Sequence, residues 1–201
     1  MPVLKRTYQV GYMPPKKRAK SAKSKLTRAL ALRTPEIKDV VLVRNIAQLN
    51  NLDINASGVF AAIEQGPLGS NRIGDRIRVL SIEVCGRVWG LEGVSTFSMV
   101  CPKDASRPPL LTDYGAAIGG QYDLSRGWSL HHSLRDPAAL AVLQETNVFK
   151  FPLGMVVCYN PPSEGDPNSV NKNEVYACHI NRTGANTTGI SYTIRVKFVD
   201  A

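Results

Sequence analysis

The sequence predicts an all-β fold, either a β-sandwich or an eight-stranded jelly roll, that follows a basic N-terminal arm. Seven or eight short apolar or alternating runs are separated by irregular and often long loops. The 16 Gly and 13 Pro residues favour such loops over a helical bundle. Positive charge is concentrated in the first 33 residues, which divides the chain into an arm and a body.

The basic arm, residues 1–33, is expected to be disordered in isolation. It holds ten of the 25 Lys and Arg residues and none of the 16 Asp and Glu residues. The body, residues 34–201, therefore has 15 basic and 16 acidic residues and a net charge of −1. Because the arm has few large apolar residues, it cannot bury enough surface to offset the entropy lost on ordering.

A terminal block of one charge is typical of an interaction tail, and a basic one most often contacts nucleic acid. Each neutralised phosphate releases counterions, so such an arm binds without reading base sequence. The candidate nucleic-acid-binding residues are Lys5, Arg6, Lys16, Lys17, Arg18, Lys20, Lys23, Lys25, Arg28 and Arg33. A second, compact pattern is typical of a nuclear-localisation signal and comprises Pro15, Lys16, Lys17, Arg18 and Lys20. A solvated tail and a membrane-surface anchor are the weaker alternatives. The arm also has no apolar stretch suited to a secretory signal or a membrane helix.

The first half of the body is expected to contribute mainly strands. Its elements in order are a strand at Val40–Val43, a turn at Asn50–Asn55, a short apolar run at Val59–Ile63, a long alternating strand at Ile77–Val88 and a strand at Ser95–Cys101. The alternation slips phase at Leu80-Ser81, which predicts a β-bulge there. Pro102 and Pro108-Pro109 are expected to end the pairing of the last strand.

The second half is expected to hold one helix and the remaining strands. Asp136–Glu145 predicts a short helix, with Asp136 as the N-cap and Pro137 in the first turn. The other elements are a strand pair or one interrupted strand at Asn147–Tyr159, a polar loop at Pro161–Asn173, a strand at Val175–Ile180 and a strand at Ile190–Val199. In the last of these, one apolar face comprises Ile190, Tyr192, Ile194, Val196 and Phe198.

The window from Gln65 to Arg87 carries a family resemblance. Its spaced elements are Gln65-Gly66, Arg72-Ile73-Gly74-Asp75, Ile77-Arg78-Val79, Ser81-Ile82-Glu83-Val84 and Gly86-Arg87. Together with residues 100–108, 173–176 and 195–200 and the basic arm, it resembles capsid proteins of small circular single-stranded DNA viruses that encode a replication initiator. These are the circovirus, geminivirus and nanovirus relatives.

This resemblance implies a single eight-stranded jelly roll of two packed antiparallel sheets that assembles into a small icosahedral shell, most simply of sixty subunits (T=1). Its partners would be a single-stranded DNA genome, further copies of itself and a host nuclear import receptor, and it would be found in the virion and the host nucleus. It identifies no host receptor. Four arginines are candidates for a basic inner surface, with a half-exposed strand face as the equal alternative: Arg72, Arg76, Arg78 and Arg87.

The sequence supports no catalytic residue, metal site or cofactor. The three histidines and four cysteines show no metal-ligand spacing, and Cys178 and His179, as neighbours on a strand, should point to opposite faces. The cysteines are expected to be buried free thiols. The loop carboxylates, including Asp113, are expected to be solvated, with binding of a divalent cation between subunits as the alternative. Two alternatives remain open: the capsid protein of a small or satellite single-stranded RNA virus, and a cellular nucleic-acid-binding module with a basic tail.

Overall fold

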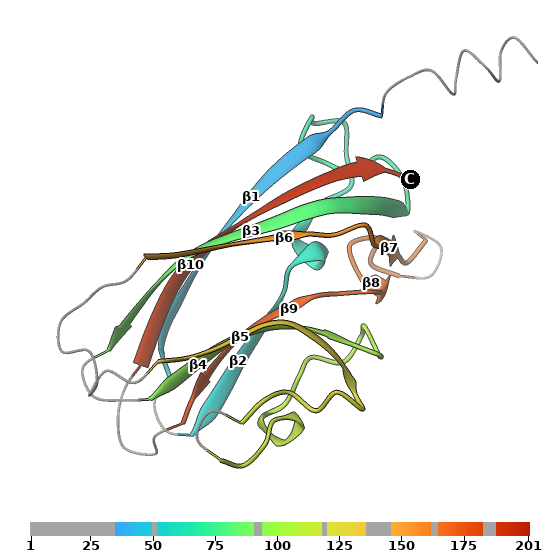
Figure 1. Ribbon diagram of the computed structural model, residues 1–201. Helices are drawn as coiled ribbons and strands as arrows, with labels where there is room; N and C mark the ends of the chain where they lie inside the picture. The colour runs from blue at the N-terminus through green and yellow to red at the C-terminus, as the bar shows by residue number, and fades with distance from the viewer. Residues whose placement is uncertain are drawn as a thin grey trace, which may run out of the picture. The chain divides into compact units, whose positions relative to one another are not determined.

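The computed structural model describes residues 35–49, 52–90, 94–117, 120–135, 146–161, 165–182 and 188–201. They form two antiparallel sheets stacked as two layers (Figure 1). The strands are β1 (Lys38–Leu49), β2 (Asp53–Gly58), β3 (Arg76–Gly90), β4 (Ser95–Pro102), β5 (Gly127–Arg135), β6 (Thr146–Pro152), β7 (Val156–Tyr159), β8 (Val170–Lys172), β9 (Tyr176–Asn181) and β10 (Thr188–Asp200). Two short 3₁₀ helices are η1 (Phe60–Ala62) and η2 (Leu111–Asp113).

The order of the strands is that of a jelly roll. The six-stranded sheet runs β1-β10-β3-β7-β8, with β6 also paired to β3, and the four-stranded sheet runs β2-β9-β4-β5. Because β6 pairs with Ser81–Arg87 and β7 with Arg76–Arg78, these two strands share one position beside β3. The chain therefore crosses between the two sheets repeatedly, after β1, β2, β3, β5, β8 and β9, in the double Greek-key pattern. The predicted jelly roll and the strand pair at Asn147–Tyr159 are confirmed.

The core lies between the two sheets and is built by strand alternation. From β3 it receives Ile77, Val79, Ile82 and Val84, and from β10 it receives Tyr192, Ile194, Val196 and Phe198, all nearly or fully buried. The predicted bulge in β3 is confirmed, since Lys197 pairs with Ser81 but Phe198 pairs with Val79, which leaves Leu80 without an opposite residue. The bulge returns the apolar side chains on both sides of it to the same face.

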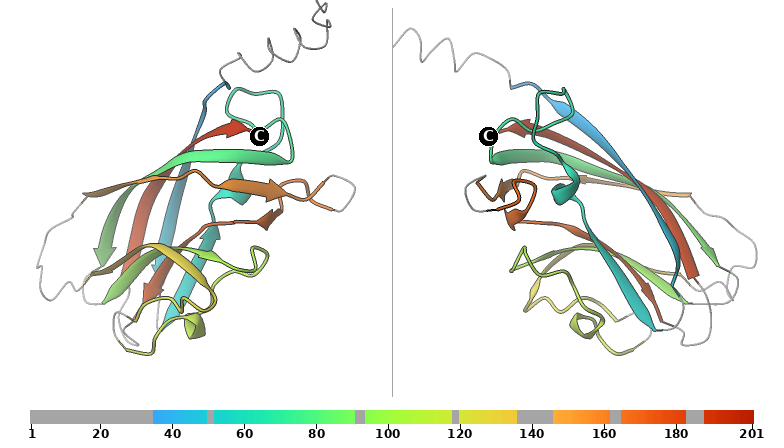
Figure 2. Two further views of the ribbon diagram at one scale, coloured as in Figure 1. Left: turned by 45° about the vertical axis from the view of Figure 1, so that its right-hand side comes forward. Right: turned by 180° about the vertical axis from the view of Figure 1, so that it is seen from behind.

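A second apolar cluster covers the far side of the four-stranded sheet. Val100, Cys178 and Ile180 pack there against Tyr114 and Tyr122 of the long segment between β4 and β5. Figures 1 and 2 show this segment lying against the four-stranded sheet on the side away from the other layer. Every residue of β4 and β9 is buried, because both faces of these central strands are covered.

Three expectations are corrected by the structure. The strand β2 begins inside the expected turn 50–55, and η1 occupies the expected apolar run 59–63. The edge strand β5 was missed, since a register shift between Met99 and Val100 interrupts its alternation. The short strand β8 lies in the expected loop 161–173, where Val170 alone is buried. The predicted helix at 136–145 lies outside the described residues. Among the residues that the structure describes, no helix is long and apolar enough to cross a membrane.

A buried carboxylate fixes η1 between the layers. Glu174 is 1% exposed, and its Oε1 accepts the backbone N–H of Phe60 at 2.7 Å while its Oε2 accepts that of Ala61 at 2.9 Å. It follows Asn173, whose φ of 64° turns the chain into β9. Burial raises the pKa of Glu174 to about 7, although the backbone donors act in the opposite direction. This carboxylate therefore ties the turn after β2 to the strand that pairs with β2.

Candidate nucleic-acid interface

The six-stranded sheet has one face turned away from the four-stranded sheet, here called the outer face. Arg76 and Arg78 alternate with the buried Ile77 and Val79 on β3, so their side chains project from the outer face, and both are exposed. Two of the four arginines considered for a basic surface are therefore on one side of one strand.

The strand register adds cations from other strands to this face, because directly paired residues project from the same side. Arg76 pairs with Cys158, which pairs with Lys172, and this places Lys172 in line with Arg76. In the next rows, Glu83 lies between Lys150 and Arg195, and Lys197 pairs with Ser81. The described strand residues of the outer face carry six cations, namely Arg76, Arg78, Lys150, Lys172, Arg195 and Lys197.

The acids on this face are fewer. Among its described strand residues they are Asp39, opposite Lys197, and Glu83. Six cations against two acids give the described strand residues of the outer face a formal charge of +4, although the whole body carries −1. Within the described residues its one ion pair joins Arg195 Nε to an oxygen of Asp39 at 3.7 Å, with both side chains about half exposed. Such a surface pair neutralises little.

Arg72 does not belong to the outer face, and its inclusion among surface candidates is corrected. Its side chain is 0% exposed, and the guanidinium lies 3.8 Å from the centre of the Tyr159 ring. It donates hydrogen bonds to the carbonyl oxygens of Gly74 and Pro167. Burial lowers the pKa of this guanidinium. The residue joins the loop before β3 to the segment before β8, a structural role that leaves it unavailable to a phosphate.

The other predicted site residues are placed only in part. The backbone of Arg87 pairs with Ser191 and Thr146, while its side chain lies outside the described part of the structure. All arm residues, including the nuclear-localisation cluster, lie outside the described residues. Sequence reasoning missed Lys150, Lys172, Arg195 and Lys197, because only the pairing of distant strands brings them to one face.

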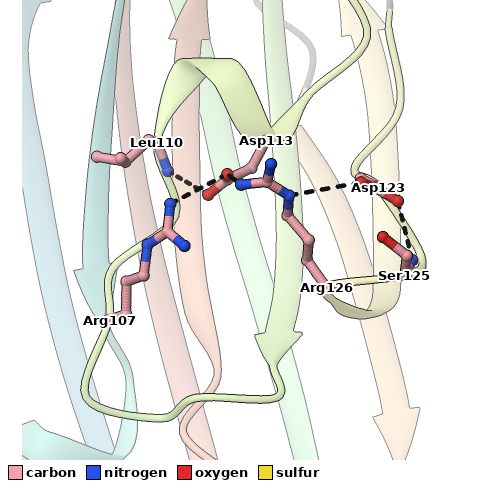
Figure 3. Close-up of polar contacts among 6 residues, drawn as sticks. All are labelled: Arg107, Leu110, Asp113, Asp123, Ser125 and Arg126. Atoms are coloured by element: carbon pink, nitrogen blue, oxygen red, sulfur yellow. Dashed lines mark hydrogen bonds and ion pairs between the residues drawn. The ribbon is translucent and has the colours of Figure 1, made fainter.

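In the segment between β4 and β5, the arginines form ion pairs with acids of the same segment (Figure 3). Asp113 is 3% exposed, and its carboxylate accepts hydrogen bonds from the Arg126 guanidinium, from Arg107 Nη2 at 3.4 Å and from the backbone N–H of Leu110 at 2.9 Å. The expectation that Asp113 is a solvated loop acid was wrong. The Arg126 Nε also lies 3.5 Å from Asp123. The arginines here neutralise acids of their own segment, unlike those of the outer face.

The residues weighed for catalysis lie apart in the fold. Cys178 packs under the segment 103–126, whereas the neighbouring His179 alternates to the opposite face of β9, as predicted. Burial raises the pKa of Cys178 to about 12 and lowers that of His179 to about 4. All four cysteines are free, as expected, but Cys85 is exposed and Cys158 is partly exposed. The described residues contain no group of three or more His, Cys, Asp or Glu placed to hold a metal.

Comparisons with known proteins give weak structural similarities. No family model and no curated protein matches the sequence. Among solved structures, Desmodium yellow mottle tymovirus superposes with a TM-score of 0.34 at 8% identity, over 82% of this chain and 89% of that one. The BFDV capsid protein in its 60-mer crystal structure gives a TM-score of 0.34 at 14% identity, over 84% and 96%. Its decameric form gives 0.30 at 13% identity, over 82% and 99%.

Proposed function

We propose that this chain is the capsid protein of a small virus, which self-assembles into an icosahedral shell and packages single-stranded DNA through its basic arm. The observation that carries the proposal is the division of charge. Ten cations without an acid precede a jelly-roll body of net charge −1. An arm of this kind can neutralise the phosphates of any sequence, as a packaging protein requires.

The body supports a structural role over a ligand-binding one. Jelly rolls also occur in lectins and cupins. In this chain the space between the sheets is filled by apolar side chains from both layers, including Phe60, Met99, Val157 and Phe198. A body near neutrality can pack against copies of itself without strong repulsion, and symmetric closure then yields a finite shell. The simplest closed form has sixty subunits.

The arm supports two further parts of the proposal. Because phosphate contacts do not read bases, the arm itself favours single-stranded DNA no more than RNA. The proposal of a DNA genome is based on the resemblance carried by the motif in Gln65–Arg87. The cluster Pro15–Lys20 would engage a host nuclear import receptor and direct the protein to the nucleus before it enters the virion. The proposed role is structural and assigns the chain no enzymatic reaction.

The test is the mass and nucleic-acid content of the purified full-length protein. Sixty subunits of 21.9 kDa give about 1.3 MDa, which light scattering separates from a monomer or dimer. We expect that particle, with ultraviolet absorbance from nucleic acid that DNase, but not RNase, removes after the shells are opened. A monomer that binds strands only when they are added would favour the cellular module, and removal by RNase would favour the RNA virus.

A charge variant then tests the arm. The combined substitution K16A/K17A/R18A/K20A should leave particles of the same mass while lowering their nucleic-acid content and the nuclear import of the protein. Each cation removed takes away about one counterion-releasing contact. If the variant body folds but no shells form, the arm is required for assembly and its proposed role in packaging is wrong.

A further inference from the structure

We infer that the outer face of the six-stranded sheet is a second contact surface for the packaged strand, so that this face is turned toward the interior of the shell. The inference rests on the proposed function in taking a single-stranded nucleic acid as the partner. It adds a binding surface on the folded body, built from cations of β3, β6, β8 and β10, to the basic arm.

The first support is the sorting of charge by face. The outer face carries six cations and two acids among its described strand residues, within a body of net charge −1. A body that needed charge only for solubility would mix both signs over its surface. On the opposite side of the molecule, Arg107 and Arg126 are held by the buried Asp113. Among the described residues, the outer face therefore has an excess of unneutralised cations that the segment between β4 and β5 does not have.

The second support is the spacing of the cations. Alternate residues on a strand are about 7 Å apart, which applies to the pairs Arg76 and Arg78, and Arg195 and Lys197. Strands lie about 5 Å apart, so the Cα atoms of Arg76 and Lys172, with Cys158 between them, are separated by about 10 Å. Long side chains at these separations can each reach a different phosphate of a flexible strand.

The third support is the composition of the described side chains on this face. Its described outward residues other than the charged ones are small or aliphatic, for example Val41, Ser81, Val156 and Cys158, and none is aromatic. These described side chains can neutralise phosphates and do not include an aromatic ring for stacking on bases, the device that single-strand binders add for affinity. Binding should therefore depend steeply on salt and little on base composition. A shell protein must accept whatever sequence its genome has, and this face meets that need.

The experiment compares charge-matched pairs of substitutions in full-length subunits that have been dissociated from the shell and freed of nucleic acid. The face variants are R76Q/R78Q and K150Q/K172Q, and the control variant is K103Q/R107Q, which removes two cations from the opposite side. The probe is a fluorescein-labelled oligothymidine of about thirty nucleotides, titrated by anisotropy between about 0.05 and 0.4 M NaCl. A urea unfolding midpoint for each variant confirms that the exposed substitutions leave the fold intact.

Each double substitution on the outer face should reduce the magnitude of the negative slope of log K against log salt by about 1.4. Each lost contact to a single-strand phosphate accounts for about 0.7 of this change. At 0.1 M salt this is about a 25-fold loss of affinity. The control should keep the wild-type slope. Equal slopes for all variants, or an equal loss in the control, would overturn the inference, because net charge and not the face would then decide. Failure of the wild-type protein to bind the probe would instead reject the proposed function.

A second readout separates nucleic acid from other polyanionic partners. Wild type and R76Q/R78Q are compared on vesicles that contain phosphatidylserine, under the same salt conditions. Because any exposed cation is attracted to anionic lipid, we expect R76Q/R78Q to lose at least as much affinity for the oligonucleotide as for these vesicles. A loss confined to the vesicles, with unchanged binding to the oligonucleotide, would assign the face to a membrane surface and refute the inference.

Discussion

Replacing Glu174 with Gln would test whether burial or hydrogen bonding has the larger effect on the pKa of this buried carboxyl group beside η1. The Glu174 carboxylate accepts backbone N–H groups from Phe60, Ala61 and Val175, which favour its charged form. Burial favours the neutral form and is the larger effect, so the pKa is raised from 4.5 to about 7. The substitution E174Q keeps the shape of the side chain and removes its titration.

The sign of the pH dependence follows from the raised pKa. A folded-state value above the ordinary one gives stability that is fully present below about pH 4.5 and is lost as the pH rises through about 7. Each pH unit between the two values corresponds to about 1.4 kcal/mol. Ionisation of Glu174 should therefore remove about 3 kcal/mol from the free energy of unfolding of the wild type between pH 4 and pH 8.

The assay is urea unfolding of dissociated full-length subunits at several pH values between 4 and 8. Because E174Q shares every other titrating group, the difference between the two proteins isolates Glu174. We expect nearly equal stability at pH 4 and a variant that is more stable by about 3 kcal/mol at pH 8. The matched control E64Q removes an exposed carboxylate from the neighbouring segment and should follow the wild type at all pH values. A wild type that gains stability relative to E174Q as the pH rises would refute the reasoning, because the backbone donors would then outweigh burial.

Two further substitutions test the assignments of buried charge. The change R72Q removes the guanidinium from the Tyr159 ring and from two carbonyl oxygens, so it should lower the free energy of unfolding by about 2–4 kcal/mol while leaving the salt slope of oligonucleotide binding unchanged. A lower salt slope without loss of stability would place Arg72 on the binding surface after all. The change D113N should destabilise by about 1–3 kcal/mol and speed proteolysis within 103–126, because it weakens the contacts to Arg107 and Arg126. The exposed neighbour gives the control D123N, for which thermal melting should show a clearly smaller loss of stability. Equal losses in both variants would contradict the special role of the buried acid.

The sequence alone determined the class of fold and the main division of charge. Strand alternation is a local property, so the apolar face of Ile190–Val199 and the phase slip at Leu80-Ser81 could be predicted without knowing the partner strands. The basic arm was equally evident, because its charge is contiguous in the chain. These local patterns were sufficient for an all-β body, and the motif in Gln65–Arg87 added the jelly-roll topology.

Strands with weak local patterns could not be predicted in this way. The strand β2 is mostly half-buried, β5 is interrupted by a register shift, and β8 has one buried residue, so none shows a clear apolar repeat. Their pairing partners, β9, β4 and β7, supply the backbone hydrogen bonds that hold them. Their existence depends on residues far away in sequence.

The candidate interface was decided mainly by the tertiary structure. Arg72 and Arg76 are four residues apart, yet one is stacked on Tyr159 in the interior and the other is exposed on the outer face. Lys150, Lys172, Arg195 and Lys197 reach that face only because β6, β8 and β10 belong to the same sheet as β3. Net charge is a sum that the sequence contains in full, whereas the face that a charge occupies depends on strand register and on which segments cover the sheet.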